Sequence, residues 1–268
     1  MGSVLQETEL SPDQVTEFRE SGWTVVRNVV PRETALALRE SAIRTADENR
    51  PPEVEFDATK NNYINDPRFQ SQHRLYPSAE SVDDLFASVV YSPRIAGIAR
   101  SLLDCDEVRH LRSIIMEKTP AAQGGQQTSW HQDFPFLPID RSRSLSVWVA
   151  LMDLPAEMGT LRFVTGSHRL GSLGRDAHMR PDADRLERFV KPDLVSPPLS
   201  LKAGDATIHA DLTIHGAAPN QSDESRWAVS IGYMDADSLY TGAPNRLTDG
   251  LGIPVNTPLD HAKFPVVR

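Results

Sequence analysis

The stretch Gly204–Asp235, GDATIHADLTIHGAAPNQSDESRWAVSIGYMD, decides the fold that we expect for this chain. It contains three short apolar runs, DATIHA, LTIHGAA and RWAVSIGYMD, which are bounded by residues that favour turns. Runs of this length between Gly, Pro, Asn and Asp are typical of the strands of a sandwich or barrel. Two of the predicted strands carry a histidine, His209 and His215, so the same stretch is a candidate for the functional site.

The pattern of short apolar runs extends upstream as far as Val108. Further runs of this kind are LRSIIMEK, SLSVWVALMDL and TLRFVTG. Strands this short, with turn residues between them, favour a sandwich or barrel over alternating strands and helices. We therefore predict a mainly β protein with flanking α-helices, built on a double-stranded β-helix (jelly-roll, cupin-like) core.

The region before this core has the pattern of helices. Ser11 can cap a first helix, and Gly22 would end it. A short run rich in β-branched residues, 23–26, is followed after Pro31 by apolar residues at helical spacing. A third helical region is predicted over residues 81–103, with an interruption at its proline.

Two polar segments interrupt the predicted elements. Residues 51–75 are irregular and rich in Pro and Asn, which is typical of a long loop that acts as a lid. Residues 176–193 are charged, and we expect them to form a long connection between two strands, with a helix near 182–189. We expect a single catalytic domain over residues 1–268. Its parts are a mostly helical N-terminal part with the lid loop (1–105), the jelly-roll core (106–235) and a C-terminal extension (236–268).

Composition excludes several classes of partner and site. The formal net charge is −9 and the Lys and Arg residues are scattered, so no basic stripe is predicted to follow a nucleic acid. No run approaches the roughly 20 apolar residues of a membrane helix, and the N-terminus lacks a signal-peptide pattern, which favours a cytoplasmic protein. The single cysteine, Cys105, cannot build a thiolate site, so any metal must be held by nitrogen and oxygen. The sequence does not indicate an oligomeric state.

The segment WHQDF places two candidate ligands close together. His131 and Asp133 are two residues apart, so on an extended segment both side chains project to the same side. A third ligand must come from elsewhere, and His209 and His215 are the candidates. Two histidines and one carboxylate on one face of an octahedron leave three positions open, as in iron(II) oxygenases. Those positions can take a 2-oxo acid and O2.

The chain resembles the phytanoyl-CoA dioxygenase family of 2-oxoglutarate oxygenases over roughly residues 107–235, and more loosely through the N-terminal helices. The matching segments are WHQDF, SVWVALMDLPAEMGTLRFVTGSHR and the stretch quoted at the start. This resemblance implies an Fe(II)- and 2-oxoglutarate-dependent dioxygenase that also consumes O2. It implies His215 as the third iron ligand, because the family's histidine is followed by Gly and shortly afterwards by Asn.

The resemblance also assigns co-substrate contacts. Arg226, on the predicted strand after His215, is expected to pair with the far carboxylate of 2-oxoglutarate, because a planar guanidinium can donate two parallel hydrogen bonds. Ser230 falls on the same face of that strand by the two-residue period. Further co-substrate contacts are expected from Gln132, Trp148 and Thr160.

The substrate is predicted only as a class. Candidate walls of the pocket are Tyr63, Gln127, Phe134, Phe136 and His209, although His209 is equally consistent with a hydrogen-bonded core histidine. Aromatic and amide side chains suit a medium-sized, partly polar molecule. No basic cluster suggests a coenzyme A site, so we expect a small metabolite, such as a secondary-metabolite intermediate. Its oxidation would give hydroxylation, or desaturation, cyclisation or epimerisation.

Two other functions remain open at this level. A jelly roll with two histidines and one aspartate can bind zinc or manganese and act as a hydrolase or isomerase. A non-catalytic β-sandwich binding protein with a degenerate metal site is the other alternative. The expected role of Arg226 argues against the first, since hydrolysis and isomerisation need no partner for a buried dicarboxylate.

Overall fold

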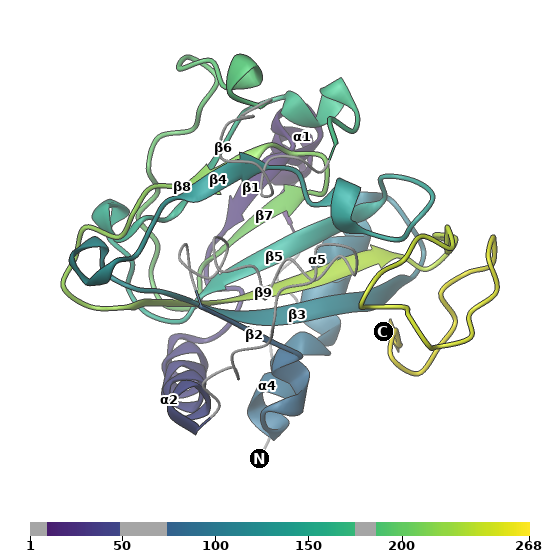
Figure 1. Ribbon diagram of the computed structural model, residues 1–268, viewed down its shortest axis with the longest axis horizontal. Helices are drawn as coiled ribbons and strands as arrows, with labels where there is room; N and C mark the ends of the chain where they lie inside the picture. The colour runs from purple at the N-terminus through teal and green to yellow at the C-terminus, as the bar shows by residue number, and fades with distance from the viewer. Residues whose placement is uncertain (1–9, 49–73, 175–185) are drawn as a thin grey trace.

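The structure, a computed structural model, describes residues 10–48, 74–174 and 186–268 (Figure 1). The described chain forms a jelly roll of two antiparallel sheets, as predicted. The large sheet has seven strands in the order β1-β7-β5-β9-β3-β10, with β2 also paired to β3. The small sheet has three strands in the order β4-β8-β6.

The strand bounds follow the apolar runs of the sequence. In the large sheet they are β1 (Trp23–Val26), β2 (Arg74–Pro77), β3 (Val108–Lys118), β5 (Ser144–Ala150), β7 (Ala206–Ala210), β9 (Arg226–Asp235) and β10 (Val266–Val267). In the small sheet they are β4 (Thr128–His131), β6 (Leu161–Phe163) and β8 (His215–Ala217).

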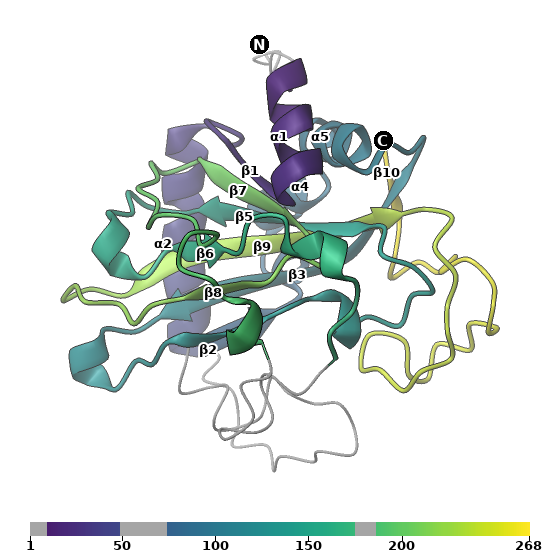
Figure 2. The ribbon, with the colours of Figure 1, turned by 90° about the horizontal axis from the view of Figure 1, so that it is seen from above.

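Four helices lie against the large sheet on the side away from the small sheet (Figures 1 and 2). They are α1 (Pro12–Ser21), α2 (Arg32–Glu48), α4 (Asp84–Val90) and α5 (Pro93–Leu103). With helices on one face and the small sheet over the other, the strand β5 is buried along its whole length. This explains why the second half of its sequence, Val147–Ala150, is a continuous apolar run.

Local signals fix the helix ends where the sequence predicts them. Ser11 accepts a hydrogen bond from the backbone N–H of Gln14, and Gly22, at φ 84°, ends α1 in the left-handed region. The predicted third helical region is divided into α4 and α5, and Pro93 begins α5. Of the helix predicted near 182–189, the structure describes residues 186–189, where Glu187–Phe189 form a 3-10 turn, η9. The other short 3-10 turns are η3 (Ala79–Ser81), η4 (Ala121–Gln123), η5 (Phe134–Phe136), η6 (Ala156–Met158) and η7 (Ser167–Leu170).

The segments that flank the predicted core also add strands to it. From the N-terminal part, β1 pairs with β7 and β2 with β3, while β10 from the C-terminal extension pairs with the other end of β3. A division at residues 105 and 235 is therefore not visible in the sheet. The single catalytic domain stays a prediction. The lid loop, apart from its last residues Arg74 and Leu75 in β2, lies outside the described residues.

The register of the large sheet aligns residues in rows across its strands. One row is Arg112 on β3, Gly232 on β9, Ser146 on β5 and His209 on β7. We call it the upper row. Nearer the other end of the inner face, Lys118 on β3 lies opposite Arg226 on β9. Because side chains alternate along a strand, the upper row and the Lys118–Arg226 pair both face the small sheet.

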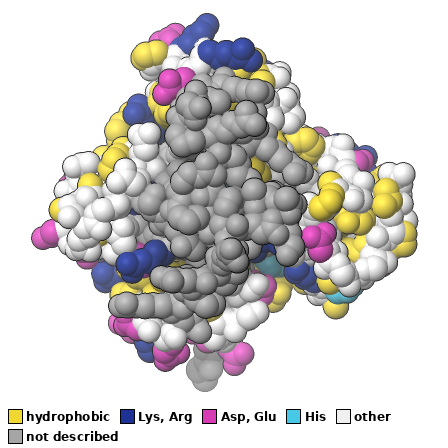
Figure 3. Space-filling view, viewed as in Figure 1, with side chains coloured by type: hydrophobic (Ala, Val, Ile, Leu, Met, Phe, Trp, Pro, Cys, Tyr) yellow, Lys and Arg dark blue, Asp and Glu magenta, His cyan; other side chains and the backbone are white. Residues whose placement is uncertain are grey.

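Apolar packing is divided between a main core and a smaller cluster. The main core lies between the large sheet, its helices and the small sheet. The smaller cluster joins the C-terminal extension to the segment after the small sheet's first strand; its buried members are Leu111, Leu137, Ile139, Met234, Leu247, Leu259 and Phe264. On the face seen in Figure 3, the side chains that the structure describes show both charges interspersed. Within the described residues no helix has the length and apolar character needed to cross a membrane.

Candidate metal and co-substrate site

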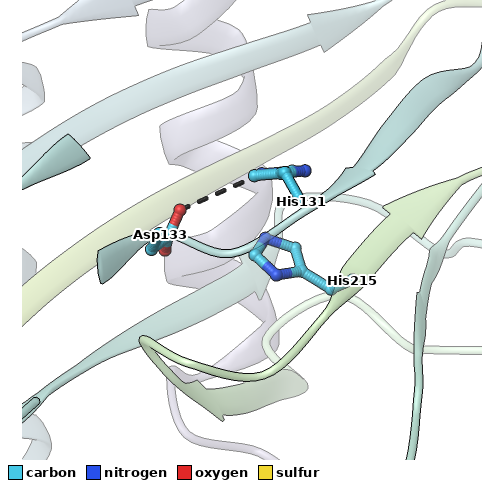
Figure 4. A group of neighbouring side chains, drawn as sticks. All are labelled: His131, Asp133 and His215. Atoms are coloured by element: carbon cyan, nitrogen blue, oxygen red, sulfur yellow. Dashed lines mark ion pairs between the residues drawn. The ribbon is translucent and has the colours of Figure 1, made fainter. Parts of the chain in front are cut away.

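Three side chains that could hold a metal ion meet between the two sheets (Figure 4). His131 ends β4, Asp133 follows two residues later, and His215 begins β8. Their candidate ligand atoms all lie within 4.8 Å of one another. The two histidines are direct partners in the register of β4 and β8, and their ring centroids are 4.1 Å apart. The set predicted from the sequence is therefore brought together in space.

Local backbone features produce this convergence. A Cβ at Gly216 would lie 2.9 Å from the carbonyl oxygen of Thr128, so the glycine allows β8 to approach β4. Asp133 lies past the end of β4 with helical backbone angles, φ −74° and ψ −40°, at the start of η5. A turn, rather than the two-residue strand period alone, thus brings its carboxylate beside His131.

The two histidines are fixed in the orientation that a metal requires. Nδ1 of His131 lies 2.8 Å from the carbonyl oxygen of Ser129, and Nδ1 of His215 lies 2.9 Å from that of Thr213. In each pair Nδ1–H donates to the carbonyl, which leaves the lone pair of Nε2 for a metal. Burial, with the neighbouring His215, lowers the pKa of His131 to about 3, so the ring is neutral at neutral pH.

Asp133 is held in its ionised form. Burial by itself would raise the pKa of this carboxyl, but the charge of Arg112 and the neighbouring histidines keep the pKa well below its ordinary value. Nη2 of Arg112 lies 2.9 Å from Oδ2 of Asp133, and the Ser146 hydroxyl donates to the same oxygen at 2.8 Å. Two imidazoles and one carboxylate form a donor set that suits iron(II).

A pocket of about 700 Å³, counting the part open to solvent, lies over these ligands. Its walls come from both sheets. They are Leu75, Arg112, Ile114, Met116, Thr128, His131, Asp133, Phe136, Trp148, Leu161, His209, His215, Arg226 and Ser230.

Arg226 lies at the end of the pocket away from the upper row. It is 2% exposed, its guanidinium stacks over the Trp148 ring at 5.0 Å, and its Nη1 donates to the carbonyl of Gly159. Its Nε has no hydrogen-bond partner among the described residues, and no carboxylate among them forms an ion pair with it. Burial lowers the pKa of Arg226 to about 9. A buried guanidinium of this kind is a site for an anionic ligand.

Lys118 places a buried amine near this end of the pocket. Its Nζ donates to Oγ1 of Thr128 at 3.0 Å, and it lies opposite Arg226 in the sheet. Burial, helped by the charge of Arg226, lowers the pKa of Lys118 to about 6. An incoming carboxylate would favour the charged form of both groups. The pocket therefore suits a ligand that brings an anionic end to Arg226 and a chelating end to the histidines.

The other predicted co-substrate contacts divide into two groups. Trp148 and Ser230 line the pocket, and Nε1 of Trp148 has no hydrogen-bond partner among the described residues. Gln132 is 1% exposed, and its amide is fully engaged with Gly171, Leu173 and Leu212. Thr160 donates to the carbonyl of Leu199 and does not line the pocket. Gln132 and Thr160 thus have structural hydrogen bonds, and the structure gives their predicted role no support.

The predicted substrate residues also divide into those that line the pocket and those that do not. Phe136 and His209 line the pocket, whereas Phe134 packs against the cluster of the C-terminal extension. Gln127 is exposed and outside the pocket lining, and Tyr63 lies outside the described residues. His209 is 2% exposed, with a ring centroid 4.1 Å from that of His215. Neither of its ring nitrogens has a hydrogen-bond partner among the described residues, so it faces the site rather than a partner in the core.

Three polar residues at the site were not predicted from the sequence: Arg112, Lys118 and Ser146. A signal for two of them was present, because Arg112, Ile114, Met116 and Lys118 alternate along one run and all but Lys118 line the pocket. The two-residue period of a strand places them on one face. What the run does not show is which face meets the metal ligands.

Comparison with known proteins gives the same family as the motifs. The sequence profile of the family "Phytanoyl-CoA dioxygenase (PhyH)" matches residues 18–228. "Phytanoyl-CoA dioxygenase domain-containing protein 1" of Danio rerio is 30% identical over 189 residues, which is 68% of this chain and 63% of that protein. The counterpart of Mus musculus is 30% identical over 185 residues, 66% of this chain and 62% of that protein. The chain thus covers somewhat less than two thirds of these relatives.

Solved structures support the same assignment. The "non-heme alpha ketoglutarate dependent carbocyclase SnoK from nogalamycin biosynthesis" is 27% identical, with a TM-score of 0.78 over 100% of both chains. The epimerase SnoN, solved with Fe3+, alpha ketoglutarate and nogalamycin RO, is 26% identical, with a TM-score of 0.75 over 96% of this chain and 98% of its own. These matches confirm the predicted fold, and both neighbours are named as alpha ketoglutarate dependent enzymes. The chain belongs to the phytanoyl-CoA dioxygenase family.

Proposed function

We propose that this protein uses Fe(II), 2-oxoglutarate and O2 to oxidise an unactivated C–H bond of a small metabolite. In this proposal His131, Asp133 and His215 hold the iron, and 2-oxoglutarate lies between the iron and Arg226. Lys118, Trp148 and Ser230 complete the co-substrate end of the pocket, while Phe136 and His209 belong to the substrate end. One catalytic domain carries the whole site.

The observation that carries this proposal is the pairing of two features in one pocket. A triad of one aspartate and two histidines that could hold a metal lies at its centre, and a buried cation, Arg226, lies at one end beside the buried amine of Lys118. A dicarboxylate that chelates a metal with its oxo acid end and places its other carboxylate against Arg226 satisfies both features. Burial of such a cation without an anion costs several kcal/mol, so the arrangement favours this ligand class.

The protein's own contribution is position and environment. When bound, iron(II) and 2-oxoglutarate supply the oxidising chemistry, in which O2 is consumed, the co-substrate is decarboxylated to succinate, and a hydrogen atom is removed from the substrate. The Nδ1 bonds of His131 and His215 hold both rings in place, and Arg226 orients the co-substrate. The apolar walls keep water away from the reacting carbon.

The substrate end of the pocket indicates a partly apolar molecule. Leu75, Ile114 and Phe136 form an apolar wall, and His209 adds a hydrogen-bonding ring beside the metal ligands. SnoK and SnoN are named as carbocyclase and epimerase of nogalamycin biosynthesis. Similarity to both supports a secondary-metabolite intermediate as the substrate here. The outcome after removal of the hydrogen atom is hydroxylation, or desaturation, ring closure or epimerisation.

The test is an anaerobic titration of the protein with Fe(II) and 2-oxoglutarate. A weak visible charge-transfer band that requires both ligands is expected, followed by succinate release when O2 is admitted. Absence of the band and of succinate would contradict the proposal and favour a hydrolase, an isomerase or a non-catalytic binding protein. A screen of metabolite libraries for increased succinate release would then identify the substrate.

A further inference from the structure

Three side chains of the upper row, Arg112, Ser146 and His209, approach one atom of the metal site. That atom is Oδ2 of Asp133. Nη2 of Arg112 lies 2.9 Å from it and Oγ of Ser146 lies 2.8 Å from it. Nε2 of His209 approaches the same oxygen to 3.6 Å, beyond hydrogen-bond range. Side chains from β3 and β5 thus contact a single carboxylate oxygen, and a ring from β7 lies close to it.

The other oxygen of Asp133 faces the remaining ligands. Oδ1 lies 3.9 Å from Nε2 of His131. The carboxylate and the Arg112 side chain are both largely buried, 11% and 12% exposed. Solvent therefore screens their interaction little, and rotation of the carboxylate would break two charge-assisted hydrogen bonds.

Gly232 makes room for this arrangement. A Cβ at position 232 would lie only 3.1 Å from Cγ of Arg112 and 3.5 Å from its Nε. The arginine thus lies across the backbone of β9, where a Cβ would press against its side chain and require it to shift by a few tenths of an ångström. The position is central in the upper row, between Arg112 on β3 and Ser146 on β5.

We propose that Arg112, seated over Gly232, and Ser146 are positioning residues that restrict Asp133 to binding the metal through Oδ1 alone. A carboxylate that is free to rotate can bind a metal through both oxygens and so occupy an additional coordination position. An oxygenase needs three open positions, two for 2-oxoglutarate and one for O2. This inference rests on the proposed function, and it assigns the upper row the task of keeping those positions open.

The proposal separates two affinities that an ordinary structural defect would lower together. In Arg112→Met, Asp133 loses a cation and gains freedom to use both oxygens, so the affinity for the metal is expected to be unchanged or higher. The affinity for 2-oxoglutarate is expected to fall roughly 10- to 100-fold, the range found when residues that orient metal ligands are replaced. Ser146→Ala and Gly232→Ala should shift both affinities in the same directions, and Arg112→Lys should restore part of the 2-oxoglutarate affinity.

Two anaerobic titrations test this: Co(II) alone, followed by visible absorption, and then 2-oxoglutarate added to the Fe(II)-loaded protein, followed by the charge-transfer band. Arg109→Met is the matched control, because Arg109 is on the same strand and pairs with Asp260 at 3.1 Å, away from the pocket. Unchanged 2-oxoglutarate affinity in Arg112→Met, or an equal loss of both affinities, would overturn the proposal. If the unsubstituted protein gives no band, the proposed function has failed instead.

Discussion

Lys118 and Arg226 lie directly opposite each other across β3 and β9, so a buried amine and a buried guanidinium are neighbours at one end of the pocket. From this relationship we predict that Arg226→Met weakens 2-oxoglutarate binding at least about 30-fold. Removing one partner of a buried charge pair costs about 2–5 kcal/mol, and each 1.4 kcal/mol is a factor of ten. The measurement is the anaerobic 2-oxoglutarate titration, with Arg109→Met as the control that should bind normally. A loss below threefold would remove Arg226 from the co-substrate site.

Lys118 leads to a prediction about stability and pH. Its pKa in the folded protein is about 6, below the ordinary 10.5, so between these values the unfolded chain binds more protons than the folded one. The contribution of Lys118 to stability therefore rises with pH across this window. Without co-substrate, Lys118→Met is expected to be more stable than the unsubstituted protein at pH 7, with a smaller difference at pH 9.

Urea unfolding of both proteins at several pH values measures this difference. Titrating groups that do not interact with Lys118 are common to the two proteins, so they cancel when the two free energies of unfolding are subtracted. A difference that is constant from pH 6 to pH 9 would show that Lys118 is charged in the folded state throughout.

Removal of the metal gives a third prediction. An ion that binds only the folded protein stabilises it by about 2.7 kcal/mol at a hundred times its dissociation constant. For a chain of this size, we expect a rise in melting temperature of roughly 5–10 °C when Mn(II) is added to chelator-treated protein. Asp133→Ala and His215→Ala should lose this rise, whereas His261→Ala, in the C-terminal extension, should keep it. A rise of the same size in all variants would place the metal elsewhere.

The features that the sequence predicts correctly depend on neighbouring residues. The hydrogen bonds that begin α1 join Ser11 to Gln14, and Gly22 supplies the left-handed turn that ends it. The same holds for most strands, whose apolar runs end at turn residues. Such signals act within a few positions of the chain, so they are visible without a fold.

The features that were missed depend on register between distant strands. Lys118 acquires its role only because β3 and β9 pair so that it faces Arg226. Gln132 shows the opposite case: it lies between two candidate ligands in the sequence, yet its amide bonds to the carbonyls of Gly171 and Leu212. Its side chain therefore points away from the pocket, and its position between two ligands in the sequence does not show this direction. The convergence of His131 and His215 needed the family resemblance as well as the spacing.

The C-terminal extension supports the substrate end of the pocket through one buried amide. Asn245 is 2% exposed, and its Nδ2 donates to the carbonyl of Phe136 at 2.8 Å, while its Oδ1 accepts from the N–H of Leu247. Phe136 in turn lines the pocket beside Asp133. Residues 236–268 lie beyond the part of the chain that the family profile matches, 18–228. The extension is thus a feature through which this chain can shape its own substrate end.

Asn245→Ala is therefore expected to lower the free energy of unfolding by about 1–3 kcal/mol, since it leaves the carbonyl of Phe136 without its buried partner. The affinity for 2-oxoglutarate should be nearly unchanged, because Phe136 and Arg226 line different ends of the pocket. Urea unfolding and the anaerobic titration measure the two effects. Thr257→Ala is the control, since its hydroxyl donates to Pro254 within the extension. If the loss of binding free energy for 2-oxoglutarate equals the loss of unfolding free energy, the extension supports the whole pocket rather than one end of it.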